Sequence, residues 1–215
     1  MYKLFIFDLD GTLIDSDAML KVSLLEMYAK YRPDFDVPEG HTVQFSGPPI
    51  AQTLAKEFPK EDTEKLAKEF LEISKKNYVL YTSLFPGVEE ILSTLLSLGK
   101  YVGVVTNKSR TATDYTFELL GLTDLVQKSV CGNEVEVGKP DPSGIFKLMK
   151  EFGISDKKEV IYIGDSEYDY LTAKNAGIDF GYVTWSPRKL DKAARIAIKI
   201  GSYFDFAEEI KYEKD

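Results

Sequence analysis

The sequence predicts an α/β protein, with a Rossmann-like three-layer core around a parallel sheet and an inserted all-helical domain. Short apolar runs alternate with longer segments of helical spacing, which is the pattern of parallel strands joined by crossover helices. The first apolar run is instead followed by residues 16–84, which contain several helical stretches broken by prolines. The 215 residues, 44% of them hydrophobic, are enough to bury a substantial core.

The core elements follow one another in order along the chain. Apolar runs predict strands at residues 4–7, 101–105, 160–163 and 182–183. Apolar positions three or four apart predict helices at residues 88–98, 111–120, 145–152 and 168–176. Each of these helices is followed by a glycine suited to a C-terminal cap, namely Gly99, Gly121, Gly153 and Gly177. The tail predicts a short edge strand at 196–200 and a closing helix at 204–210.

Residues 16–84, called the helical insert below, are expected to form a cap domain on a core made of residues 1–15 and 85–215. Helices are predicted at 17–31, 50–58 and 62–78, with Pro33, Pro38 and Pro59 near their ends. An insert at this point can pack over the carboxyl ends of the parallel strands, where ligands bind in open α/β sheets. We therefore expect it to act as a lid.

Composition excludes several classes of protein. The net charge of -8 opposes general binding to nucleic acid, which depends on Lys and Arg contacts to phosphates. The single cysteine, Cys131, can form neither an internal disulfide nor a thiolate zinc site, and we expect it to pack as a small hydrophobe. The single histidine, His41, argues against a two-histidine metal motif and against Ser-His-Asp chemistry. Any acid–base catalysis is therefore expected from carboxyl groups.

From the sequence we expect neither a secretory signal peptide nor a membrane span. Its first apolar run is interrupted at Asp8, too early for a signal peptide, and no run reaches the roughly 20 apolar residues of a membrane span. We expect a cytoplasmic protein without a membrane or nucleic-acid partner, as a monomer or alternatively a homodimer.

Polar side chains stand at the ends of three predicted strands and in one loop. Asp8 and Asp10, two residues apart, project to one side of an extended segment and can share a metal ion, while Gly11 permits a tight anion-cradling turn. Thr106 and Asn107 end the second strand and can hydrogen-bond to phosphoryl oxygens. Taken singly, these motifs fit equally ordinary roles in turns and helix caps.

The remaining two motifs lie later in the chain. Lys139 stands in a proline-rich loop that can hold its ammonium group beside an anion. Asp165 ends another strand, and Asp169 follows one helical turn later, so that both acids can face one crevice. Solvated side chains and helix capping are the ordinary alternatives. The ordered occurrence of all four motifs at one edge of a sheet favours a site.

The four motifs resemble those of the haloacid dehalogenase superfamily of aspartate-nucleophile phosphohydrolases. The resemblance rests on Asp8-Leu9-Asp10-Gly11-Thr12, Thr106-Asn107, Lys139 and Gly164-Asp165 with Asp169, and it spans nearly the whole chain. The helical insert, with Phe45-Ser46-Gly47-Pro48-Pro49, is similar to the cap of the phosphoglycolate phosphatase-like branch.

This resemblance implies an Mg²⁺-dependent phosphatase that acts on a small-molecule phosphomonoester, phosphoglycolate-like or a sugar phosphate. Asp8 is the implied nucleophile, which forms an aspartyl-phosphate, and Asp10 the implied acid and base. The implied metal ligands are Asp8, Asp165 and the backbone carbonyl of Asp10, an oxygen-only set suited to Mg²⁺.

The other matching residues have supporting roles by the same resemblance. Thr106, Asn107 and Lys139 would stabilise the charge of the transferring phosphoryl group. Asp169 would orient Lys139 or the water shell of the metal. Leaving-group recognition is expected from the helical insert and its surroundings, with candidates Asp15, Ser16, Arg32, Ser46 and Lys108. For His41 we expect a surface role or a contact within the insert.

Three alternatives remain open. A phosphomutase similar to β-phosphoglucomutase, or an inorganic pyrophosphatase, would use the same core and differ in what the insert admits. A phosphate-binding regulatory module, such as a response-regulator receiver, also combines a parallel sheet with acids, a threonine and a lysine. Against it stand the helical insert, the length of the chain, and the position of Asp165 after Lys139.

Overall fold

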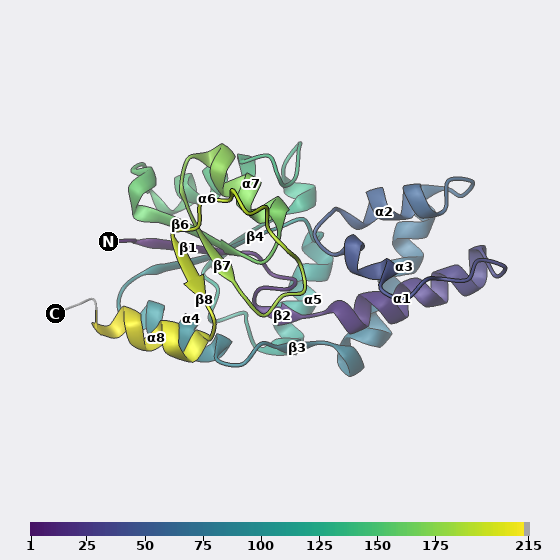
Figure 1. The fold of residues 1–215 in the computed structure, drawn as a ribbon, viewed down its shortest axis with the longest axis horizontal. Helices are drawn as coiled ribbons and strands as arrows, with labels where there is room; N and C mark the ends of the chain where they lie inside the picture. Colours follow the sequence, from purple (N-terminus) through teal and green to yellow (C-terminus); the bar gives the residue numbers. More distant parts are fainter. Residues whose placement is uncertain (213–215) are drawn as a thin grey trace.

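A six-stranded, wholly parallel sheet forms the centre of the molecule, in the order β5-β4-β1-β6-β7-β8 (Figure 1). A computed structural model describes residues 1–212, so residues 213–215 of the expected core lie outside the described part. The strands are β1 (Leu4–Phe7), β4 (Tyr101–Thr106), β5 (Lys128–Cys131), β6 (Val160–Gly164), β7 (Asp179–Val183) and β8 (Ile198–Ile200). The predicted α/β class is confirmed.

Helices cover both faces of this sheet. The helices of the core are α4 (Val88–Ser97), α5 (Arg110–Leu120), α6 (Ser143–Phe152), α7 (Glu167–Ala176) and α8 (Tyr203–Tyr212). Phe5 and Phe7 of β1 belong to the apolar cluster shared with α4, α5 and α8, whereas Leu4 and Ile6 belong to the cluster shared with α6 and α7. Because successive side chains of a strand point to opposite faces, burial on both faces explains why β1 is a continuous apolar run.

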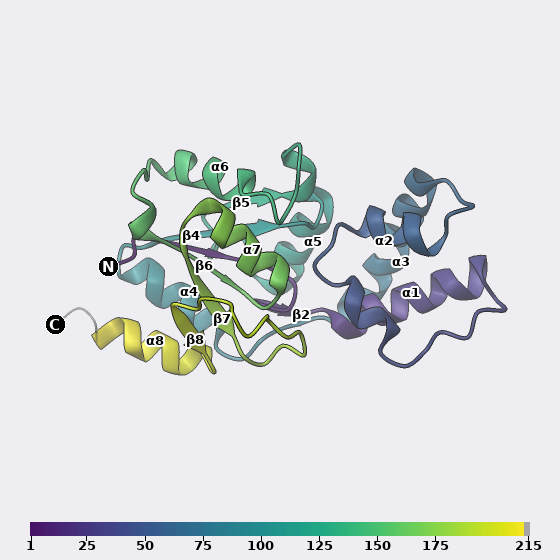
Figure 2. The same ribbon diagram turned by 45° about the horizontal axis from the view of Figure 1, so that its top comes forward.

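The helical insert forms a separate lobe beside the core (Figures 1 and 2). It contains α1 (Asp17–Tyr31), the short 3-10 helix η1 (His41–Phe45), α2 (Ile50–Glu57) and α3 (Thr63–Tyr81). Both α1 and α2 pack on α3 around a third apolar cluster, whose buried members include Leu24, Leu54, Leu66 and Phe70. This lobe therefore has an apolar core of its own.

Two short strands join the insert to the core. β2 (Ile14–Asp15) and β3 (Ser83–Leu84) pair antiparallel, with Ile14 opposite Leu84 and Asp15 opposite Ser83. The chain therefore enters and leaves the insert through adjacent segments (Figure 1). Two further 3-10 helices, η2 (Gly132–Glu134) and η3 (Lys157–Glu159), lie in connections of the core.

Most predicted elements occur near their predicted bounds, with some differences. β7 begins at Asp179, three residues before the prediction, and β8 is shorter than predicted. The sequence prediction missed β5 and the β2–β3 pair. β5 starts with the polar residues Lys128 and Ser129, and only Val130 and Cys131 are buried, so the strand lacks an apolar run of ordinary length. Cys131 is buried, as predicted.

Candidate active site

The carboxyl ends of three neighbouring strands bring the candidate residues together. β1 lies between β4 and β6, and all three run in the same direction. Asp8 directly follows β1, Thr106 is the last residue of β4, and Asp165 directly follows β6. These side chains therefore meet at one edge of the sheet, the edge that faces the helical insert (Figure 2).

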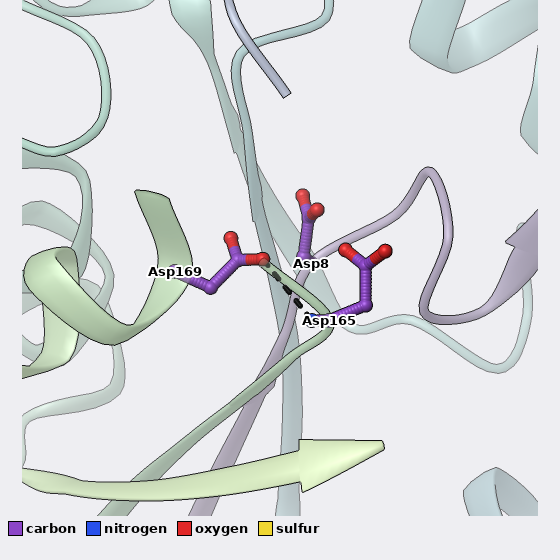
Figure 3. Close-up of side chains that lie close together, drawn as sticks. All are labelled: Asp8, Asp165 and Asp169. Atoms are coloured by element: carbon purple, nitrogen blue, oxygen red, sulfur yellow. Dashed lines mark hydrogen bonds between the residues drawn. The ribbon is translucent and has the colours of Figure 1, made fainter. Parts of the chain in front are cut away.

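Three buried acids form a compact group at this edge. One carboxylate oxygen each from Asp8, Asp165 and Asp169 lies within 4.8 Å of the others (Figure 3). Asp169 is fixed by the backbone N–H groups of Asp165 and Ser166, which donate to its Oδ2 at 3.1 and 3.0 Å. A Cβ on Gly164 would lie 2.3 Å from the Cβ of Asp169, so only glycine permits this close approach.

Lys139 bridges two of the acids. Its Nζ lies 2.7 Å from Oδ1 of Asp8 and 2.7 Å from Oδ1 of Asp169. Its own backbone N–H donates to Oδ1 of Asn107 at 2.8 Å, so Asn107 holds the lysine loop against the end of β4. The hydroxyl of Tyr162, which the sequence analysis did not single out, lies 3.2 Å from Oδ1 of Asp169.

Burial and mutual repulsion govern the ionisation of the three acids. Burial, and then the charge of Asp169, raise the pKa of Asp8 well above its ordinary value, although Lys139 opposes the shift. Burial and Asp169 likewise raise the pKa of Asp165 to about 6. The pKa of Asp169 is also subject to burial, but its ion pair with Lys139 outweighs that effect and lowers it. A cation placed among these acids would offset both the cost of burying their charges and the repulsion between them.

The three acids fit a divalent metal ion. They offer only oxygen atoms, which hard cations such as Mg²⁺ prefer, and a single lysine stands among them. The third carboxyl group of this cluster belongs to Asp169. The third metal ligand expected from the sequence was the backbone carbonyl of Asp10.

The side chain of Asp10 has partners outside the acid group. It receives hydrogen bonds from Nζ of Lys108, at 2.8 Å to Oδ1 and 3.1 Å to Oδ2, and from Oγ of Ser16 at 2.6 Å. Although burial favours the neutral acid, the positive charge of Lys108 outweighs it and lowers the pKa of Asp10. Lys108 and Ser16, candidates for recognition of the leaving group, are thus both bound to the candidate acid–base residue.

An unpredicted arginine completes the surroundings of Asp165. Nη1 of Arg188 donates to Oδ2 of Asp165 at 2.7 Å, and Oγ of Ser186 donates to the same oxygen at 2.6 Å. The other end of the Arg188 guanidinium pairs with Asp17, at the start of α1. Both Arg188 and Ser186 come from the loop between β7 and β8, which has no strand-end motif that could have revealed them.

Gly11 is required where the first loop passes this group. Its φ is +84°, and a Cβ at this position would lie 2.3 Å from Oδ2 of Asp165. Only glycine adopts this conformation readily and leaves the space free. The loop after β1 can therefore turn directly over Asp165.

Thr106 and Asn107 line the same cavity as Asp8. Oγ1 of Thr106 accepts from the backbone N–H of Lys108 at 3.2 Å. Nδ2 of Asn107 donates to the backbone carbonyl of Gly47 at 2.9 Å, so the end of β4 is tied to the insert. Both residues are thus placed to approach a ligand that contacts Asp8.

The remaining residues singled out from the sequence, Asp15 of the core and three residues of the insert, do not all line the cavity. Ser46 lines the cavity, whereas Asp15 is exposed on β2. Arg32 donates to the backbone carbonyl of Glu57 at 2.9 Å and does not line the cavity. His41 makes contacts within the insert, with its Nε2 3.1 Å from the hydroxyl of Tyr28.

A cavity of about 470 Å³ separates the strand ends from the helical insert. Its floor contains Asp8, Asp10, Thr106 and Lys139, and its other wall is made by the insert. This volume is in the range of small-molecule sites, which is roughly 300–1,000 Å³. The arrangement combines the buried Asp8 carboxylate, the Asp10 carboxylate, a lysine and a threonine at the base of one cavity.

A family model for haloacid dehalogenase-like hydrolases matches residues 5–183. The chain belongs to this family. The match includes β1, the helical insert and the strand ends of the acid group, and it confirms the resemblance seen in the sequence. Because curated relatives named as phosphatases also match, the chain is a phosphatase enzyme of the haloacid dehalogenase family.

Relatives and solved structures agree with this membership. Pyrophosphatase PpaX of Halalkalibacterium halodurans is 30% identical over 86% of this chain and 85% of its own length. Phosphoglycolate phosphatase of Pasteurella multocida is 30% identical over 84% of this chain and 87% of its own. CbbY from Rhodobacter sphaeroides, solved in complex with phosphate, superposes with a TM-score of 0.81 at 15% identity, over 94% of this chain and 95% of that one. The last similarity shows a shared fold.

Among residues 1–212, no helix is both long and apolar enough to cross a membrane.

Proposed function

We propose that the protein is an Mg²⁺-dependent phosphatase that hydrolyses a small-molecule phosphomonoester in the cytoplasm, through a phosphorylated Asp8. The observation that carries the proposal is the position of Asp8 at the floor of the cavity, where Lys139 joins it to Asp169. Residues 1–15 and 85–215 are the catalytic core in this proposal, and residues 16–84 are the cap.

The first step transfers the phosphoryl group to Asp8. An oxygen of the Asp8 carboxylate attacks phosphorus, and the bond between phosphorus and the leaving oxygen breaks. In this proposal Lys139, Thr106 and Asn107 bind the phosphoryl oxygens, which is supported by their positions around Asp8 in the cavity lining. These groups offset the repulsion between the carboxylate and an anionic substrate.

Asp10 moves the protons. In its neutral form it donates a proton to the leaving alcohol, and as a carboxylate it then takes a proton from the water whose oxygen attacks phosphorus. The bond between phosphorus and the Asp8 oxygen breaks in that second step, which releases inorganic phosphate and restores the Asp8 carboxylate. Lys108 holds the Asp10 carboxylate in place by two hydrogen bonds, and Ser16 adds a third. Asp10 and the nucleophile Asp8 therefore have different hydrogen-bond partners as well as different proposed roles.

The acid group would hold the metal ion through Asp8 and Asp165, with the backbone carbonyl of Asp10 and a contribution from Asp169. When bound, Mg²⁺ supplies positive charge that stabilises the phosphoryl group during transfer. Asp169 meanwhile keeps Lys139 beside Asp8 by its ion pair.

Pyrophosphate hydrolysis is the second candidate, because the chain is 30% identical to a protein named pyrophosphatase PpaX. The same attack by Asp8 would then break the bond between phosphorus and the bridging oxygen. The two candidates differ only in the leaving group.

Phosphate release tests the proposal. Purified protein is incubated with a panel of phosphomonoesters and with pyrophosphate, in the presence of Mg²⁺ or of EDTA. We expect release that requires Mg²⁺ and that Asp8→Asn reduces by at least about 1,000-fold, because the amide cannot form the phosphorylated intermediate. Asp114→Asn, in an exposed ion pair on α5 outside the cavity, is the control that retains activity.

A second readout addresses the intermediate itself. Acid-quenched enzyme analysed by intact mass spectrometry should carry one added phosphoryl group, and Asp8→Asn should not. Release that persists in Asp8→Asn or in EDTA would contradict the proposed mechanism.

A further inference from the structure

We infer that the natural substrate is a phosphomonoester of a largely apolar alcohol that carries no second anionic group. This inference rests on the phosphatase function proposed above and names its substrate class. It follows from the wall of the cavity that faces the leaving group.

That wall is apolar. It is formed by the helical insert, and its main side chains are Met19, Leu20, Phe45, Ile50, Phe70 and Leu71. The reacting phosphoryl group lies at the opposite floor, beside Asp8 and Lys139, so the leaving group of a bound ester extends toward these side chains. An apolar leaving group would be removed from water by this wall and would gain binding free energy.

The polar groups of the wall are few, and most of them already have partners. Oγ of Ser16 donates to Asp10 at 2.6 Å, and Oγ of Ser74 donates to the backbone carbonyl of Phe70 at 2.6 Å. Ser46 and Lys68 are further polar side chains of the insert in this lining, and the hydroxyl of Tyr78 interacts with Lys108 and Thr116. The several hydroxyls of a sugar would lose water without gaining enough partners.

Two of the three lysines that line the cavity are paired with carboxylates. Lys139 is paired with Asp8 and Asp169, and Lys108 is paired with Asp10. Lys68, the remaining cation among the described lining residues, is exposed to solvent on α3. The carboxylate of phosphoglycolate or the second phosphate of pyrophosphate would therefore be buried beside apolar carbon without a free buried cation.

Leu71 offers a way to change the wall without disturbing the fold. It lines the cavity from α3 and is half-buried, but it is not part of the apolar cluster that holds α1, α2 and α3 together. Its contacts therefore matter to a ligand more than to the insert.

The test compares esters that have similar leaving groups and different polarity. Values of kcat/KM are measured for cyclohexylmethyl phosphate and for glucose 6-phosphate, which both carry a six-membered ring on a primary alcohol, and for phosphoglycolate and pyrophosphate. We expect the cyclohexylmethyl ester to exceed each of the others by at least about tenfold. Leu71→Gln should raise its KM by about tenfold and change kcat little.

The matched control is Leu80→Gln, which makes the same substitution on α3 at a side chain that is 73% exposed and lies outside the cavity. It should leave all four values unchanged. A preference for glucose 6-phosphate, phosphoglycolate or pyrophosphate, or an unchanged KM in Leu71→Gln, would overturn the inference and leave the phosphatase function intact. Absence of release from every compound would overturn both.

Discussion

Asp10 and Lys108 show how one ion pair sets the ionisation of a candidate catalytic group. The positive charge of Lys108, and then its two hydrogen bonds, lower the pKa of Asp10 although its carboxyl group is buried. A general acid must be protonated before it can donate, so a lower pKa moves the fall in donor activity toward lower pH. Lys108 also lies 4.8 Å from the ring centre of Tyr78, which places the cation between the core and the insert.

Lys108→Met should therefore shift the pH dependence of kcat. Removal of the positive charge raises the pKa of Asp10, so its protonated form persists to higher pH. For an alkyl phosphate, whose departure needs a proton, we expect the alkaline limb of kcat to move upward by about one pH unit, which corresponds to about 1.4 kcal/mol. The pH–rate profile of the variant and of the parent protein provides the measurement.

The control for this shift is Lys76→Met, which removes an exposed cation from α3. The leaving group of 4-nitrophenyl phosphate departs without a proton. With this substrate, Lys108→Met should shift the alkaline limb of kcat much less than with the alkyl phosphate. An identical profile for the variant and the parent with the alkyl ester would show that Asp10 is not the acid.

The sequence predicted which strand-end residues lie together in the site, but not the side chains that surround them. Asp8, Thr106 and Asp165 were visible because each ends an apolar run and parallel strands share one edge. Arg188 and Ser186 were not visible, because they reach Asp165 from an irregular loop whose path depends on tertiary packing. The bond from Lys108 to Asp10 crosses from one strand end to another, and no local pattern predicts such a side-chain pairing.

Among the secondary-structure elements, α4 and α8 depend on a glycine at their contact. Gly87 precedes α4 with a φ of +83°, and a Cβ there would lie 2.9 Å from the backbone nitrogen of Phe204 in α8. Gly99, which follows α4, has a similar φ of +68° but no atom within 4 Å of its Cβ position. Comparing Gly87 with Gly99 therefore distinguishes the cost of a strained backbone conformation from the added cost of a steric clash.

Gly87→Ala should lower the free energy of unfolding by about 2–4 kcal/mol, since left-handed strain and overpacking add together. Gly99→Ala, with strain alone, should cost about 1–2 kcal/mol. Chemical denaturation followed by circular dichroism measures both values. Equal losses in the two variants would contradict the close approach of α4 and α8.

The elements themselves were predictable where local pattern and burial agree. β1 and α1 have the predicted bounds, because a strand buried on both faces is a plain apolar run and because Pro33 follows the end of α1. β5 escaped prediction because it is paired on one side only, to β4, and has two buried residues. The β2–β3 pair has two residues per strand, and only the tertiary fold brings its halves together.

The molecule as a whole consists of two lobes that enclose the cavity between them. Contacts between the lobes include the hydrogen bond from Asn107 to Gly47 and the ion pair of Arg188 with Asp17. The rings of Tyr78 in α3 and Tyr115 in α5 also meet, 5.7 Å apart. A ligand that contacts both lobes would add to these contacts and favour the closed arrangement.

Binding of a phosphate analogue should therefore protect the insert from hydrogen exchange. With Mg²⁺ and orthovanadate, we expect slower exchange in residues 16–84, concentrated in the segments that line the cavity. Hydrogen–deuterium exchange with mass spectrometry measures this, and Asp8→Asn under the same conditions is the control. Unchanged exchange throughout residues 16–84 in the parent protein would count against closure of the insert.

The pairing of Asp15 with Ser83 has a consequence for how such proteins diversify. Because the two ends of the insert lie side by side, the segment between them could be replaced without changing the connections of the core. A gene segment that encodes another helical module, spliced in at these two residues, would leave every strand of the sheet in register. New substrate preferences can therefore arise by exchange of one contiguous stretch of coding sequence, while Asp8 and its neighbours stay where the sheet has put them.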